Sequence, residues 1–102
     1  MKIIFFDNKI EKFMKRLNAN TLARTIRTIE LLNEFEYRLG LPHSKSIGKG
    51  LFELRIHGRH NVRILYVFHK EYIVLLHGFI KKTNQIPKKE FNTALQKKKQ
   101  LD

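Results

Sequence analysis

Cysteine is absent from this 102-residue chain, and acidic side chains are few. Without cysteine the chain can form neither a disulfide nor a thiolate metal site, which fits an intracellular setting without requiring it. No apolar run approaches the roughly 20 residues that a membrane-spanning helix needs, so no membrane partner is expected. Asp7 interrupts the apolar start of the chain, and a secretory signal peptide is therefore not expected.

Several catalytic patterns are missing as well. The sequence has no acidic cluster for magnesium, no Ser-His-Asp arrangement and no phosphate-binding loop, because Gly48–Lys49–Gly50 is too short for one. His57 and His60 lack the helical spacing of zinc signatures and support a metal site only weakly. We therefore predict no metal and no cofactor, and a nucleotide-hydrolysing enzyme has no support.

Positive charge is abundant. The chain has 21 Lys and Arg against 9 Asp and Glu, which gives a formal net charge of +12. A small protein this basic is attracted to polyanions, of which nucleic acid is the common one. A solvated basic surface without a dedicated partner is the alternative.

The hydrophobic periodicity predicts one α+β domain over residues 1–102. A strand at 2–6 is followed by two amphipathic helices that form a hairpin; the second begins at a cap at Asn20 or Thr21, carries Ile26 and Phe35 on its apolar face and ends at Gly40. Residues 40–50 have the composition of a loop. Strands at 51–57, 61–69 and 72–80 follow, and Pro87 opens a last helix. The expected order is β-α-α-β-β-β-(α), a small antiparallel sheet with the helical hairpin on one face and a groove on the other.

An arginine interrupts each of two predicted strands: Arg55 lies in the strand at 51–57 and Arg63 in the strand at 61–69. Alternation places Glu53, Arg55 and His57 on one face of their strand. A hairpin centred near Arg59 would bring Arg63 opposite Arg55, and like charges in that position destabilise a sheet by about 0.2–1 kcal/mol. We therefore predict that an anion binds there, and Arg55, Arg63, Lys81 and Lys82 form the first candidate site, suited to phosphate.

Proton-transfer groups are less clear from the sequence. Histidine can move a proton near neutral pH, and His57 and His60 flank Arg59 in the first turn. Glu53 is either a base or a counter-ion that neutralises Arg55, and the sequence leaves both roles open.

Three motifs carry a resemblance to a known family. They are K-x-x-G-x-G-L-F-E-L-R-I from Lys45 to Ile56, V-R-I-L-Y-V from Val62 to Val67, and L-L-H-G-F-I-K-K-T from Leu75 to Thr83, followed by Pro87. Together with the element order they resemble the RelE superfamily of toxins, and most closely its HigB-like, phage Gp49-like branch.

The resemblance implies a metal-independent, ribosome-dependent endoribonuclease of the cytoplasm that cuts mRNA in the ribosomal A site. The 2′-hydroxyl attacks the neighbouring phosphate and leaves a cyclic phosphate and a 5′-hydroxyl. Carried over by position, the implied catalytic set comprises Arg55, Arg63 and Lys82. The last segment lacks the tyrosine or histidine that some members use for proton transfer, so Glu53 and either His57 or His60 are the candidate proton-transfer groups. Glu53 stands where family members have a basic residue. The residues expected to bind RNA are Lys81, Arg59, His60, Lys49 and Lys88.

The resemblance also implies partners. One partner is a cognate antitoxin, a HigA-like helix-turn-helix protein. The toxin–antitoxin complex would bind operator DNA through this antitoxin. Two other functions remain open: a ParE-like toxin that inhibits gyrase and cuts no RNA, and a non-enzymatic module that binds RNA or the ribosome.

Overall fold

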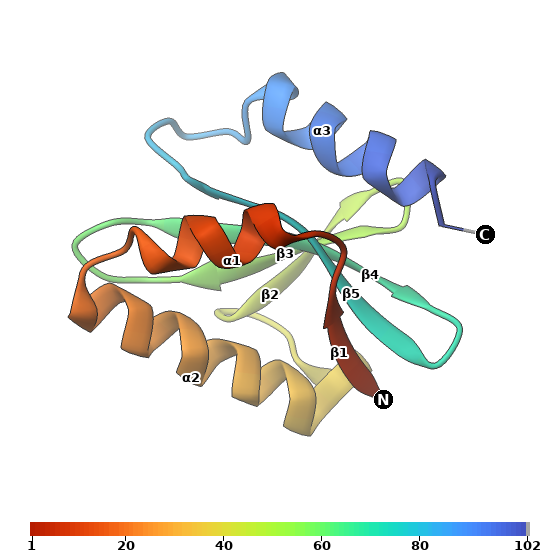
Figure 1. Cartoon of the computed structure of the whole chain (residues 1–102), viewed down its shortest axis with the longest axis horizontal. Coiled ribbons are helices and arrows are strands. Elements are labelled where there is room, and N and C mark those ends of the chain that lie inside the picture. Colours follow the sequence, from red (N-terminus) through yellow and green to blue (C-terminus); the bar gives the residue numbers. More distant parts are fainter. Residues whose placement is uncertain (102) are drawn as a thin grey trace.

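The computed structural model describes residues 1–101, and the predicted α+β class is confirmed (Figure 1). Within this range no helix is both long and apolar enough to cross a bilayer. The elements, in chain order, are β1 (Lys2–Phe5), α1 (Asn8–Lys15), α2 (Ala19–Phe35), a 3₁₀ turn η1 (Glu36–Arg38), β2 (Ser44–Gly48), β3 (Leu51–Ile56), β4 (Val62–His69), β5 (Tyr72–Ile80) and α3 (Lys88–Lys99).

The five strands form one mixed sheet in the order β1-β5-β4-β3-β2. The expectation of a purely antiparallel sheet is wrong at one edge, where β1 pairs in parallel with β5. The expectation of a loop over residues 40–50 is wrong for Ser44–Gly48, which pairs with β3. Its polar composition hides this strand, because an edge strand exposes much of its surface. The Ser44 side chain is nevertheless buried and hydrogen-bonded to Tyr66 on β4, and burial raises the pKa of Tyr66.

The helices α1 and α2 pack on the same face of the sheet, as predicted, and each begins at a side-chain cap. Asp7 accepts a hydrogen bond from the Lys9 amide at 3.1 Å, and Asn18 accepts one from the Thr21 amide at 2.8 Å. The expected cap at Asn20 or Thr21 is therefore too late by at least two residues. The expected end at Gly40 is also wrong, because α2 ends at Phe35 and η1 follows.

The buried face of α2 is built largely from threonine. Thr21, Thr25 and Thr28 are buried together with Leu32, whereas Ile26 and Phe35 are 46% and 38% exposed. The hydroxyls of Thr25 and Thr28 donate to carbonyl oxygens four residues earlier, at 2.8 Å each, so their burial leaves no unpaired hydroxyl. The apolar face predicted for α2 therefore differs from the face that is buried. Hydropathy alone does not count a threonine as a core residue, even when its hydroxyl is hydrogen-bonded.

Two apolar clusters lie on the two faces of the sheet. One includes Leu54, Ile64 and Leu75 and packs against α1 and α2. The other includes Leu65, Val74 and Leu76 and packs against Ala94 of α3. Since α3 lies on the opposite side of the sheet from α2 (Figure 1), it covers part of the face that was expected to stay open.

Three polar contacts fix α3 on the sheet. Glu90 lies 2.8 Å from the His77 imidazole of β5, and Lys97 donates to the Leu76 carbonyl at 2.8 Å. The Lys98 ammonium donates to the carbonyl oxygen of Lys49 in the β2–β3 turn. Lys97 is buried and also lies 3.1 Å from the Asp7 carboxylate. Two lysines of the basic C-terminal run are therefore structural anchors.

The Asp7–Lys97 pair gives the fold a defined dependence on pH. Partial burial acts to raise the pKa of Asp7, but Lys97 and the Lys9 amide outweigh it and leave this pKa below its usual value. A depressed folded-state pKa contributes stability that is complete above the unfolded pKa of about 3.9 and is lost as the pH falls through the folded value. We expect Asp7→Asn, which keeps the cap, to be about 1 kcal/mol less stable than the parent at pH 7. Urea unfolding at pH 7 and pH 3 checks this, and a difference that persists unchanged at pH 3 contradicts it.

Candidate functional site

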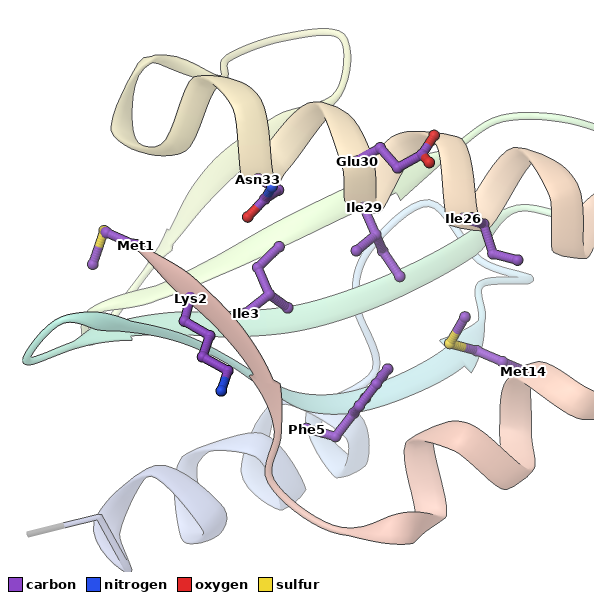
Figure 2. A pocket seen from close by; sticks show the side chains of 9 residues that line it. All are labelled: Met1, Lys2, Ile3, Phe5, Met14, Ile26, Ile29, Glu30 and Asn33. Carbon is purple, nitrogen blue, oxygen red and sulfur yellow. The ribbon is translucent and has the colours of Figure 1, made fainter.

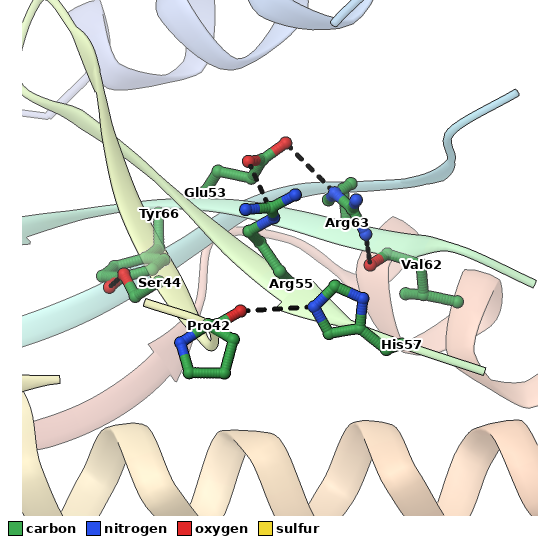
Figure 3. Close-up of polar contacts among 8 residues, drawn as sticks. All are labelled: Pro42, Ser44, Glu53, Arg55, His57, Val62, Arg63 and Tyr66. Atoms are coloured by element: carbon green, nitrogen blue, oxygen red, sulfur yellow. Dashed lines mark hydrogen bonds and ion pairs between the residues drawn. The ribbon is translucent and has the colours of Figure 1, made fainter. Parts of the chain in front are cut away.

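The β3–β4 hairpin places Arg55 directly opposite Arg63, as the sequence predicted. The anion between them belongs to the chain itself. The Glu53 carboxylate lies 3.2 Å from Arg63 Nε and 3.6 Å from Arg55 Nε (Figure 3). Because Glu53 and Arg55 are two residues apart on β3, their side chains share one face of the sheet. We call these three residues the arginine–glutamate cluster.

The three members differ in their access to solvent. Glu53 and Arg63 are only 3% and 4% exposed, whereas the Arg55 side chain is 26% exposed. Arg63 Nη1 also donates to the Val62 carbonyl at 3.1 Å. Burial and the nearby Arg55 charge lower the pKa of Arg63, and Glu53 opposes this shift. A solute phosphate would therefore meet Arg55, with Arg63 behind it.

The cluster retains unused hydrogen-bonding capacity. Glu53 Oε2, Arg55 Nε and Arg63 Nε are buried and make no hydrogen bond to any residue of the part of the chain described, so the contacts among them are ion pairs without hydrogen-bond geometry. Buried donors and acceptors of this kind are costly to leave unpaired. The part of the cluster that an oxygen ligand can reach is the partly exposed Arg55 side chain.

Arg55 also lines a hollow at the edge of the sheet, beside α2. This edge hollow has a volume of about 430 Å³, and its lining includes His43, His57, Arg24 and Arg27. His57 Nε2 lies 3.3 Å from the Pro42 carbonyl oxygen (Figure 3), and Arg24 Nη1 donates to the His57 carbonyl at 3.4 Å. Three arginine residues and two histidine residues thus line one space, although the Arg55 guanidinium itself lies on the Glu53 face of the sheet. Only Arg55 and His57 were predicted as site residues, because no local pattern links His43, Arg24 or Arg27 to β3.

A second space lies between α3 and the strands β2 and β3. This α3 groove has a volume of about 390 Å³, and four charged residues line it: Lys45, Glu53, Lys81 and Lys88. Lys81 and Lys88 were predicted to bind RNA. Lys45 was missed as a site residue because its segment was expected to be a loop. It stands directly opposite Glu53 in the β2–β3 ladder, so the strand pairing brings it to the cluster. Lys82 follows Lys81 and is exposed.

The remaining predicted residues lie apart from these two spaces. Arg59 lines a different hollow beside the start of α2, and His60 is exposed in the β3–β4 turn. Lys49 lies in the β2–β3 turn, at the opposite end of β3 from Arg55. The structure thus joins Glu53, Arg55, Arg63, Lys81 and Lys88 through the cluster and the groove, with His57 beside Arg55.

Another hollow has a different character. It measures about 630 Å³, lies between β1, α1 and α2, and is lined mainly by apolar side chains that include Phe5, Met14 and Ile26 (Figure 2). Lys2 and Glu30 are the only charged side chains among the residues that line it, and the Met1 ammonium is paired with Glu36, so it offers no cationic set for a phosphate. Across residues 1–101, no three His, Cys, Asp or Glu side chains are grouped to hold a metal ion.

Comparison with known proteins places the chain in a family. The family model described as phage derived protein Gp49-like (DUF891) matches residues 12–99, which include every residue of the cluster, the edge hollow and the α3 groove. The chain belongs to the Gp49-like family. This family includes RelE-like toxins, and its members are generally toxin-like proteins of type II toxin–antitoxin systems. None of the curated proteins matches the sequence.

The geometry of the cluster predicts that Glu53 is essential for stability. Glu53→Gln leaves Arg63 buried without a counter-charge, and removing one partner of a buried pair costs about 3 kcal/mol. Urea unfolding monitored by circular dichroism measures this cost, and Glu34→Gln, at an exposed position of α2, is the control. Unfolding of Glu53→Gln within 0.5 kcal/mol of the parent, a margin typical of surface changes, would show that Arg63 does not depend on Glu53.

Proposed function

We propose that this Gp49-like protein is the toxin of a type II toxin–antitoxin pair and cleaves mRNA on the ribosome, as a HigB-like endoribonuclease. The observation that supports this most is the position of Arg55. Its side chain is partly exposed and lies against Glu53, Arg63 stands opposite it, and the residue also borders a hollow lined by His43 and His57. Cations and proton-transfer groups are the two requirements for transesterification of RNA.

In the proposed reaction the 2′-oxygen forms a bond to phosphorus and the bond from phosphorus to the 5′-oxygen breaks. The 2′-hydroxyl loses its proton to a base, and the departing 5′-oxygen gains one from an acid. Negative charge accumulates on the phosphoryl oxygens in the transition state, and Arg55 stabilises it directly. Arg63 acts through its field and by holding Glu53 in place. Preorganised donors are effective because they need no reorganisation as the charge develops.

The geometry favours His57 over Glu53 as the proton carrier. His57 is exposed and lines the same hollow as Arg55, whereas both Glu53 oxygens face guanidinium groups. We expect His57→Ala to reduce cleavage at least tenfold, since general acid–base catalysis contributes about 10²–10⁴-fold. Single-turnover cleavage of ribosome-bound mRNA measures this, with Asn61→Ala, at an exposed position of the same turn, as the matched variant that retains activity. If His57→Ala keeps full activity, His57 is not the proton carrier, and Glu53 or His43 takes that role.

In this proposal the protein acts in the cytoplasm and binds RNA and the ribosome through its positive charge. Lys81, Lys82 and Lys88 lie on the segment after β5 and contact the mRNA strand beside the scissile phosphate. The exposed cations on α1 and α2 face ribosomal RNA: Lys12, Lys15, Arg16, Arg24 and Arg27. Such binding weakens steeply with salt. Arg59 and Lys49 add to the same positive field from farther away, and His60 offers its ring nitrogens to RNA as hydrogen-bonding groups.

Family membership suggests an antitoxin partner. We propose a HigA-like helix-turn-helix protein that binds this toxin and carries the complex to operator DNA. The net charge of +12 makes direct binding of DNA by the toxin possible through charge alone, but base-specific contacts in such a complex would come from the recognition helix of the antitoxin.

Two other functions are distinguished by experiment. A ParE-like gyrase inhibitor would need no cluster of arginines beside the edge hollow, and it would leave mRNA intact and cause DNA breaks. A non-enzymatic RNA-binding module would need the charge but not the imidazoles. Mapping of 5′ ends of mRNA after induction separates them, because codon-phased new ends appear only with the nuclease.

Replacement of Arg55 tests the proposed function most directly. Arg55→Ala removes the accessible guanidinium, and the loss of one such donor reduces the rate about 10²–10³-fold, so growth arrest and codon-phased ends should disappear. Arg63 is a poorer choice because it is buried. Arg38→Ala, at an exposed position of η1, is the matched control and should remain toxic.

The folded state of Arg55→Ala is verified by circular dichroism before the comparison. If a folded Arg55→Ala protein arrests growth as strongly as the Arg38→Ala control, then Arg55 does not act on the phosphate and the proposed site is wrong. If the parent protein arrests growth without cutting mRNA, the proposed nuclease function is wrong.

A further inference from the structure

The α3 groove combines an apolar floor with polar edges. Ile47, Ile86 and Phe91 contribute partly buried apolar surface that packs against the core cluster beneath α3. Asn84 and Gln85 add exposed amides on the segment between β5 and α3. A phosphate alone would make no use of an aromatic ring and two aliphatic side chains. A nucleobase would, since it is flat and apolar on its faces and carries hydrogen-bonding groups at its edge.

Glu53 gives the groove a chemical preference. Its Oε2 is buried against Arg63, its Oε1 accepts no hydrogen bond within residues 1–101, and its carboxylate lines the groove from the β3 side. An ionised carboxylate only accepts hydrogen bonds. It therefore suits the exocyclic amino group of adenine, cytosine or guanine, and it disfavours uracil, whose edge presents two carbonyl oxygens around one N–H.

The cations of the groove are placed for the backbone on either side of such a base. Lys45 lies across the ladder from Glu53, and Lys81 and Lys88 lie on the opposite wall. An acidic peptide could pair with these lysines, but its carboxylates would meet the Glu53 carboxylate at the β3 wall. The combination of apolar floor, acceptor edge and cationic rim thus favours a nucleotide over an acidic peptide.

We propose that the α3 groove binds one unstacked RNA base that carries an exocyclic amino group, with Phe91 as the stacking surface and Glu53 as the hydrogen-bond acceptor. This inference rests on the proposed function, because it places that base on the strand whose phosphate meets Arg55. It assigns to the groove a base preference that the phosphate site alone cannot provide.

The test uses RNA that cannot be cleaved. The full-length protein is titrated into fluorescent 2′-O-methyl hexanucleotides of adenine, cytosine or uracil, and binding is followed by anisotropy at fixed salt. We expect the adenine or cytosine hexamer to bind about tenfold more tightly than the uracil hexamer. Phe91→Ala should remove this preference and weaken binding of the preferred hexamer about tenfold, within the range for loss of one stacking contact.

Two further variants keep the result interpretable. Leu95→Ala shortens another α3 residue that packs on the same core cluster outside the groove, and it should keep the base preference. Asn84 is exposed and lines the groove, so Asn84→Ala is not expected to affect folding. Because it removes an amide of the groove, it should reduce the base preference. Equal binding of all hexamers by the parent protein, or an unchanged preference in folded Phe91→Ala, overturns the proposal.

A peptide competitor completes the design. If a hexaglutamate peptide displaces RNA from the parent protein and Phe91→Ala abolishes this displacement, the groove is a protein-binding site and the proposal is overturned. The binding assay does not require cleavage, so a base preference can be confirmed even if the chain cuts no mRNA. Conversely, mRNA cleavage without base preference refutes the groove proposal alone.

Discussion

The Glu53 carboxylate between the Arg55 and Arg63 guanidinium groups is the interaction on which the site depends. Without it, two cations would face each other across β3 and β4, and one of them would be buried without a partner. With it, the cluster keeps one net positive charge and holds Arg55 in a defined direction. The carboxylate thus stabilises the hairpin and orients the exposed arginine at the same time.

The second constraint is the attachment of α3. This helix is tied to β5 through Glu90 and Lys97 and to the β2–β3 turn through Lys98. These contacts hold the helix against β4 and β5, and the α3 groove lies between the helix and the strands β2 and β3. On the other face, Gly78 allows α1 to lie close to the sheet. A Cβ at Gly78 would come within 2.7 Å of the Phe13 ring, which explains physically why the H-G-F motif has glycine there.

Much of the hairpin could be predicted from the sequence, because alternation fixes which side chains share a face and a short turn fixes the register. Arg55 opposite Arg63 follows from these two rules alone. The strand Ser44–Gly48 could not be predicted, since its pairing partner and the Ser44–Tyr66 hydrogen bond are tertiary features. Lys45 was missed for the same reason. The edge hollow was beyond prediction too, because only the packing of α2 against β3 brings Arg24 and His43 beside Arg55.

The two spaces share the strand β3, although one lies beside α3 and the other beside α2. Glu53 lines the α3 groove, and Arg55, two residues later, borders the edge hollow while its guanidinium stays on the Glu53 face of the sheet. Two residues of a strand span about 7 Å, so one RNA strand crossing β3 could place a base in the groove and a neighbouring phosphate at Arg55. A site that recognised charge alone would bind any polyanion. Because Glu53 withdraws one charge from the cluster and offers a hydrogen-bond acceptor instead, binding at this hairpin should depend on the identity of the base as well as on the phosphate.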